Sequence, residues 1–244
     1  MSLELYVKES LNMPSGKVIA QAAHALGMAF MSHCELVGED SDKVTLKVHD
    51  RDGHFNCSLD SLLSRINVDF VDDDVFESMK SREDNVTVVI DNGLTCFNHQ
   101  KTETVILLDK SEGVVDRSKR LQFDVDAGVF VKQGFFVNRA KPTTDSALIV
   151  HGAALSLSMI TALIGVDSTL TLDKSSEMYK WLSSAFGKTV VGSKKQSKFD
   201  VVADAIVNAS YDFRVGLGEA LIVTAPISVE ELSQLTYTKT FRLY

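Results

Sequence analysis

The sequence has few cysteines, no long apolar run and no basic-then-apolar leader. Its three cysteines, Cys34, Cys57 and Cys96, form no CxxC pair and cannot all be paired, which favours a reduced, cytoplasmic setting. No apolar run approaches the roughly 18 to 20 residues that span a bilayer, so we expect no membrane association. The opening residues, MSLELYVKES, do not match a secretory signal. These absences argue against a disulfide-rich secreted domain and a membrane protein.

The composition is that of an ordinary globular chain. Of the 244 residues, 45% are hydrophobic and 24% are charged, which is enough apolar material for a substantial core. The length allows one large domain or two small ones. The absences and the composition together predict a globular protein of one or two domains.

The net charge of −8 is unevenly distributed. Residues 1–122 carry 13 Lys and Arg against 21 Asp and Glu, whereas residues 123–244 carry 12 of each. An acidic half is unfavourable for contacts with nucleic-acid phosphates. We interpret the acidic cluster formed by Asp69 and 72–74 as a solvated face. The densest basic stretch, 188–198, is either a polyanion contact or a mobile loop, and the loop is favoured.

The chain contains a weak but collinear internal repeat. Segment 44–47 (VTLK) is echoed by 170–173 (LTLD), and segment 93–109 is echoed by 209–225. The order is the same in both halves and no Gly/Ser-rich or Pro-rich linker separates them. We therefore predict two copies of one fold, at residues 1–123 and 124–244, that abut directly.

Periodicity and turn residues predict the elements of the first copy. Strands are expected at 3–8, 43–49, 86–90 and 104–108, and helices at 17–32 and 59–66. Strands that alternate with helices predict an α/β fold, with two tandem three-layer α/β/α domains. Each domain is expected to hold a small mixed sheet flanked by helices, and the two are expected to pack as a pseudo-dimer.

Two segments carry side chains suited to chemistry. On the predicted helix, Lys17, Gln21 and His24 share one stripe, and Lys17 lies in the first turn, where the helix dipole already favours an anion. In the segment DNGLTCF, Asp91 ends a buried strand before a glycine-containing turn, and ligands often bind at the carboxyl ends of strands. From these residues alone, a solvated lysine, a core-edge histidine and a simple turn remain the favoured interpretations.

The same segments resemble the type 2 peptidyl-tRNA hydrolases. GKVIAQAAHA, from Gly16, resembles the signature that opens a helix in this family, and DNGLT resembles its Asp-Ala-Gly-x-Thr turn, with Asn92 in place of alanine. TETVILLD resembles the strand that follows, and TKTFRLY is similar to the C-terminal strand. The resemblance covers residues 3–110 and, more faintly, the rest. Leu94 stands where the family usually has a basic residue.

The resemblance implies hydrolysis of the ester between a peptide, or an amino acid, and its tRNA. It implies a site made of catalytic and substrate-binding positions: Lys17, Asp91, Thr95 and Thr104 as catalytic residues, and Gly16, Gln21, His24 and Gly93 as substrate-binding residues. Asp91 would orient or deprotonate water, and Lys17 would stabilise the oxyanion or hold the terminal phosphate. The threonines would donate hydrogen bonds to the ester or ribose; a threonine nucleophile ranks lower.

No cofactor is expected, and no metal site, because the histidines show no HxxxH or HExxH spacing. The second copy has lost the motif: Ala140-Lys141-Pro142 replaces Gly16-Lys17, and counting back from Phe213 aligns Val207 with Asp91. Because the family's enzymes are generally homodimers, the resemblance implies a monomeric pseudo-dimer, with a homodimer of whole chains still possible. The alternatives are a non-catalytic RNA- or protein-binding module, or a hydrolase of another ester or amide.

Overall fold

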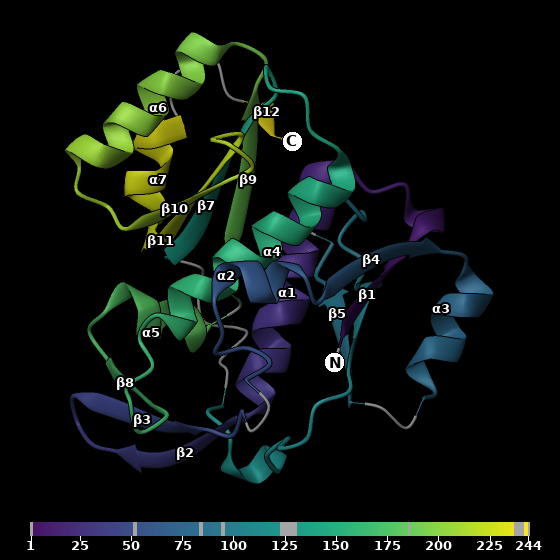
Figure 1. The fold of residues 1–244 in the computed structure, drawn as a ribbon, viewed down its shortest axis with the longest axis vertical. Coiled ribbons are helices and arrows are strands. Elements are labelled where there is room, and N and C mark those ends of the chain that lie inside the picture. The colour runs from purple at the N-terminus through teal and green to yellow at the C-terminus, as the bar shows by residue number, and fades with distance from the viewer. Residues whose placement is uncertain are drawn as a thin grey trace.

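The computed structural model describes residues 2–50, 53–82, 85–93, 96–122, 131–184, 186–236 and 242–243. These residues form a mixed α/β structure with three β-sheets (Figure 1). The strands are β1 (Leu3–Lys8), β2 (Cys34–Glu39), β3 (Lys43–Val48), β4 (Ile66–Val71), β5 (Asn85–Asp91), β6 (Thr102–Asp109), β7 (Val131–Asn138), β8 (Thr169–Asp173), β9 (Lys188–Ser193), β10 (Phe213–Gly216), β11 (Leu221–Ser228) and β12 (Arg242–Leu243). The α-helices are α1 (Ser15–Ser32), α2 (Leu59–Leu63), α3 (Asp73–Lys80), α4 (Asp145–Thr161), α5 (Glu177–Leu182), α6 (Gln196–Asn208) and α7 (Val229–Thr236), with short 3-10 helices η1 (Glu9–Leu11) and η2 (Arg117–Lys119).

The same strand arrangement occurs in the first and second sheets. The first sheet has the order β4-β1-β6-β5, with β1 parallel to β4 and β6 antiparallel to both β1 and β5. The second sheet has the order β12-β9-β7-β11-β10, with β7 parallel to β9 and β11 antiparallel to both β7 and β10. Apart from β12, the strands therefore follow one another in the same order and sense in both halves of the chain.

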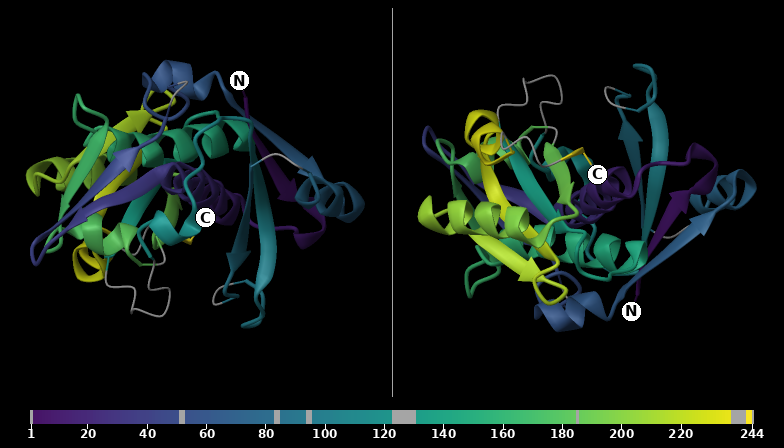
Figure 2. Two further views of the ribbon diagram at one scale, coloured as in Figure 1. Left: turned by 90° about the horizontal axis from the view of Figure 1, so that it is seen from below. Right: turned by 90° about the horizontal axis from the view of Figure 1, so that it is seen from above.

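Helices α1 and α4 lie between these two sheets and pack against each other (Figures 1 and 2). Helix α3 covers the outer face of the first sheet, and α6 and α7 cover the outer face of the second. The central core contains residues of both halves, among them Leu5, Phe30, Phe135 and Leu155. No helix within the described ranges combines the length and apolar composition needed to cross a membrane.

The third sheet joins the two halves through β3 and β8, with β2 on the far side of β3. Thr45 lies opposite Thr171, and their hydroxyl oxygens are 3.4 Å apart. Val44 lies opposite Leu172 and Leu46 opposite Leu170, so the VTLK and LTLD segments pair reciprocally. Reciprocal pairing of equivalent residues is the pattern of an isologous, two-fold contact. The repeated segments thus meet each other directly in space.

Small residues allow α1 and α4 to approach closely. The buried face of α1 carries Ala22, Ala25 and Ala29, all at most 1% exposed. On α4, a Cβ atom built at Gly152 would lie only 2.7 Å from Cγ2 of Ile19 on α1. Atoms at that separation overlap, so the helix contact requires glycine at this position.

Several sequence predictions are corrected by the structure. The basic stretch 188–198 is not a loop, because it forms β9 and the start of α6. Val207 lies in α6, not at a strand end, so it is not the counterpart of Asp91. Strand β4 occupies Ile66–Val71, where no strand was expected. The acidic residues 72–74 are exposed as predicted, and they also start α3: the Asp72 side chain accepts a hydrogen bond of 2.8 Å from the Val75 N–H.

Two glycines test the contact between α1 and α4. Substituting alanine for a mid-helix glycine gains about 1 kcal/mol of helix propensity, and this gain applies equally to Gly152→Ala and Gly27→Ala. A Cβ at Gly27 would meet the Phe186 ring at an ordinary 3.6 Å, whereas a Cβ at Gly152 overlaps Ile19. We expect Gly152→Ala to have a free energy of unfolding about 1–3 kcal/mol below that of Gly27→Ala in urea titrations. Equal stabilities would contradict the close approach.

Candidate active site

The candidate site lies where the first turn of α1 meets the carboxyl end of β5. The ammonium group of Lys17 forms an ion pair with Oδ2 of Asp91. The Gln21 side-chain amide donates a hydrogen bond of 2.6 Å to the same oxygen. The backbone N–H of Gly93 donates a bond of 2.8 Å to Oδ1. One carboxylate therefore ties together the helix, the strand end and the following turn.

Thr104 supports the Asp91 carboxylate indirectly, through Gln21. The Thr104 hydroxyl on β6 lies 3.3 Å from Oε1 of Gln21 and 3.2 Å from the Val89 carbonyl oxygen. When it donates to Gln21, a directed chain runs from Thr104 through Gln21 to Asp91. Thr104 is fully buried and Gln21 is 4% exposed, so neither side chain is solvated. The geometry therefore fixes Gln21 in one orientation and makes Thr104 its support.

The ion pair is shielded but remains accessible. The Lys17 side chain is 16% exposed and the Asp91 side chain 10% exposed. The Lys17 ammonium also lies 6.0 Å from the centre of the Phe97 ring, within range of a cation–π contact. A cation in the first turn opposes the helix dipole, and the Asp91 carboxylate offsets that cost. Partial burial strengthens the field that this ammonium presents to a ligand.

The turn after β5 depends on Gly93. Its φ is +76°, and a Cβ atom there would lie 2.5 Å from the Gln100 carbonyl oxygen and 2.6 Å from the Gln100 nitrogen. Both are backbone atoms, so the clash cannot be relieved by a side-chain rotation. The glycine keeps this N–H directed at Asp91.

The other expected site residues lie as follows. Gly16 is buried in the first turn of α1. His24 lies further along the same helix and faces the second half of the chain, with its ring centre 6.4 Å from that of Phe186. Thr95 lies outside the described residues. The structure thus brings together five of the eight expected residues as direct neighbours, described above, and places His24 beyond them. No group of three or more potential metal ligands occurs among the residues that the structure describes.

Burial lowers the pKa of His24 well below the usual histidine value, and the positive charges of Lys188 and Lys17 lower it further. A hydrogen bond with the Phe186 backbone opposes this shift. These effects favour the neutral form of the His24 imidazole at physiological pH. Sequence reasoning included His24 but missed Lys188, which stood in a stretch interpreted as a loop.

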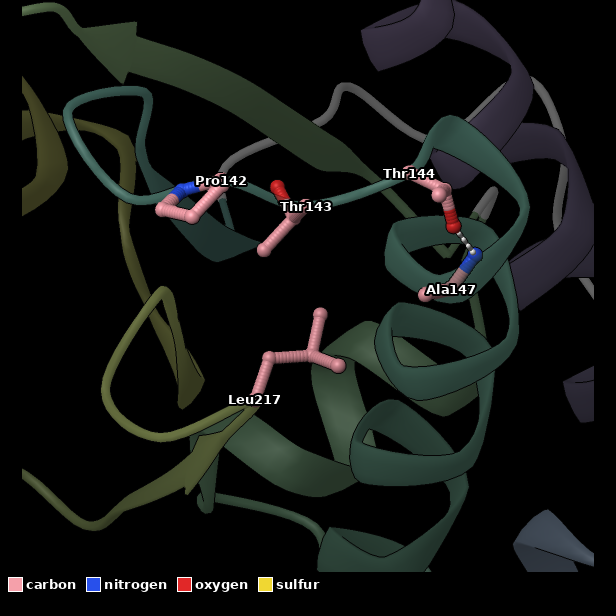
Figure 3. A pocket seen from close by; sticks show the side chains of 5 residues that line it. All are labelled: Pro142, Thr143, Thr144, Ala147 and Leu217. Atoms are coloured by element: carbon pink, nitrogen blue, oxygen red, sulfur yellow. Dashed lines mark hydrogen bonds between the residues drawn. The ribbon is translucent and has the colours of Figure 1, made fainter.

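The second half has a cavity at the start of α4 that lacks this polar network. Residues from the start of α4 and from the turn after β10 line a cavity of about 540 Å³ (Figure 3): Pro142, Thr143, Thr144, Ala147 and Leu217. Thr144 caps α4 by accepting a hydrogen bond of 3.2 Å from the Ala147 N–H. Lys141 reaches across to the Gly218 carbonyl and to Glu219, at 3.4 Å from its Oε2. A more exposed ion pair lies here, in contrast to the partly buried Lys17–Asp91 pair.

Comparisons of the chain with models of protein families, with curated proteins and with solved structures find no match. The geometry of the site therefore carries the functional argument.

Two glycines in corresponding turns test the site. Gly93→Ala and Gly218→Ala both force alanine into a positive φ, at +76° and +57°, and both carry a cost of about 1 kcal/mol. Only Gly93→Ala adds a backbone clash, since nothing lies within 4 Å of a Cβ at Gly218. We expect thermal unfolding to show a larger destabilisation for Gly93→Ala, by about 1–3 kcal/mol. A larger loss for Gly218→Ala would argue against the described turn.

Proposed function

We propose that the chain hydrolyses the ester bond of peptidyl-tRNA or aminoacyl-tRNA. The observation that carries this proposal is the network of Lys17, Gln21, Asp91 and Thr104, in which a partly exposed ammonium is held by a carboxylate at a strand end. The proposed substrate is inferred from the resemblance of these segments to the type 2 peptidyl-tRNA hydrolases. No step in the proposal requires a cofactor.

An activated ester needs positioned water and stabilisation of negative charge. Water adds to the ester carbonyl, the resulting tetrahedral intermediate loses the ribose oxygen, and a carboxylic acid and a ribose hydroxyl are formed. The Lys17 ammonium stabilises the oxyanion. Asp91 already receives three donors, so its main role is to hold Lys17 and to orient the water. Thr104 acts as a positioning residue for Gln21, because its hydroxyl is buried and contacts only Gln21 and the Val89 carbonyl oxygen among its hydrogen-bond partners described above.

We further propose that the chain is a covalent pseudo-dimer of two copies, at 1–123 and 124–244. Its support is the matched strand order of the first two sheets and the reciprocal pairing of β3 with β8. The boundary between the copies falls within residues that the structure does not describe. In this proposal the second copy stands where a homodimeric enzyme has its partner subunit.

The alternative is a non-catalytic module that binds RNA or protein. The acidic balance of residues 1–122 favours it, because RNA binding relies on cationic contacts. The retained polar network favours the enzyme, because a binding module does not require a partly buried ion pair that is held in place by a buried threonine.

The hydrolase proposal is tested by release of N-acetyl-amino acid from N-acetyl-aminoacyl-tRNA. We expect Lys17→Ala to lower kcat/KM by about 100- to 1,000-fold, because it removes the charge opposite the developing oxyanion. Asp91→Asn is expected to cause a similar loss, since the amide no longer holds the ammonium by charge. Circular dichroism and thermal unfolding establish that each variant remains folded.

The matched controls are Lys141→Ala and Glu219→Gln, which remove the exposed ion pair of the second copy. We expect both to retain wild-type kcat/KM. An inactive wild-type chain, or equal activity in Lys17→Ala and Lys141→Ala, would overturn the hydrolase proposal and favour the binding module.

The pseudo-dimer proposal is tested by light scattering coupled to size exclusion. Because α1 and α4 already cover each other within one chain, we expect a monomer of 26.8 kDa at micromolar concentration. A concentration-independent species of twice that mass would contradict it.

A further inference from the structure

Lys188 occupies an unusual position at the start of β9. Its side chain is half-buried, and its ammonium lies 4.8 Å from the centre of the Trp181 ring and 5.5 Å from that of Phe186. It donates one hydrogen bond, of 3.0 Å, to the Phe186 carbonyl oxygen. An ammonium has three N–H donors, so this contact leaves two available. The rings orient the group without neutralising it.

No carboxylate pairs with Lys188 in the part of the chain that the structure describes. Burial lowers the pKa of Lys188 well below the usual lysine value, as expected for a desolvated cation without a counter-ion. Desolvated charges are normally paired, and a binding site is where a counter-charge from a ligand completes the pair.

His24 connects Lys188 to the candidate active site. Lys17, Gln21 and His24 lie on one stripe of α1, and His24 contacts the ring of Phe186, next to Lys188. Lys17 precedes His24 by about two turns of α1, and Lys188 lies over the Phe186 ring that His24 contacts, so the two lysines lie on either side of this imidazole, one from each half of the chain. A ligand that reaches from Lys17 along the helix therefore meets a neutral imidazole and then a second cation.

We infer that Lys188, beside His24, forms a phosphate-binding subsite by which the second half of the chain completes the active site of the first. The inference rests on the proposed function and deepens it. In a peptidyl-tRNA the carboxyl group next to the scissile bond is esterified, so the anions closest to that bond are the phosphodiesters of the RNA. A lysine that acts as a compact point charge suits such a group.

Trp181 provides a direct readout, because it is the only tryptophan in the chain and its ring contacts Lys188. The probes are the trinucleotide CCA, which carries two phosphodiesters, adenosine, which carries none, and inorganic phosphate. We expect a saturable change in tryptophan fluorescence with CCA and none with adenosine. This comparison uses only the wild-type chain, so it tests the inference even where a variant fails to fold.

The variants separate charge from packing. Lys188→Met retains the length of the side chain against the two rings, and we expect it to weaken CCA binding by at least about tenfold, as for the loss of one charge-assisted contact. Lys188→Arg keeps the charge and is expected to bind within a few-fold of wild type. The matched control is Lys194→Met, at an exposed lysine of the same basic stretch, which should bind as wild type does.

Equal CCA binding by wild type and Lys188→Met, an equal response to adenosine, or no response in wild type overturns the inference. Inorganic phosphate binding as tightly as CCA would assign the group to free phosphate and overturn the substrate subsite. Hydrolysis is measured separately, so the two proposals fail independently. Lys188-dependent CCA binding without ester cleavage refutes the proposed hydrolysis alone, and cleavage with unchanged KM in Lys188→Met refutes the subsite alone.

Discussion

The close contact between α1 and α4 is the constraint on which the rest of the structure depends. Ile19 can approach the α4 backbone only because residue 152 is glycine. Helix α1 lies between the two sheets, so its faces make different contacts. A face of small apolar residues packs against α4, and Lys17 and Gln21 contact the end of β5. A rotation of α1 that relieved one contact would disrupt the other, so core packing and site geometry are mechanically coupled.

The structure combines a nearly symmetric framework with asymmetric chemistry. The strand order and the positive-φ glycines at 93 and 218 recur in both halves, and β3 pairs with β8 between them. The partly buried Lys17–Asp91 pair has only a more exposed counterpart at Lys141 and Glu219. Apolar burial holds each half together, so the polar site of one half can be lost without loss of the fold. The second half can then contribute different residues to the candidate site, as Lys188 does in the proposed subsite.

Local patterns predicted those elements that have a clear periodicity. Strand β1 alternates between buried and half-buried residues and was predicted at its observed bounds, and the predicted strand at 86–90 lies within β5. Strand β4 was missed although Ile66, Val68 and Phe70 alternate with polar residues, because the helix predicted at 59–66 already included the first residue of the strand. Helix α1 starts at Ser15, two residues before the expected position, because Pro14 occupies the N-cap.

The candidate site was predictable only as a set of positions. Sequence spacing placed Lys17, Gln21 and His24 on one stripe, and strand ends placed Asp91 near them. The role of Thr104 depends on a contact between β6 and α1, 83 residues apart in the chain, which no local pattern encodes. The burial of Lys188 depends on Trp181 and Phe186 and on the packing of the second half against α1. The other lysines of the stretch 188–198 led to the prediction of an exposed loop, because local sequence does not encode these contacts.

The net charge of −8 is a weak argument against RNA binding. The acidic residues at 72–74 start α3, where the helix dipole favours negative charge, and Lys8 lies 3.8 Å from Asp73. Surface charges are screened within about 8–10 Å at physiological salt, whereas a partly buried cation acts on its ligand with little screening. In the proposed function, Lys17 and Lys188 would bind phosphates at the end of an RNA strand rather than along its length. The proposed hydrolase would therefore gain little from non-specific binding, and its recognition of tRNA would depend on a few phosphates beside the ester.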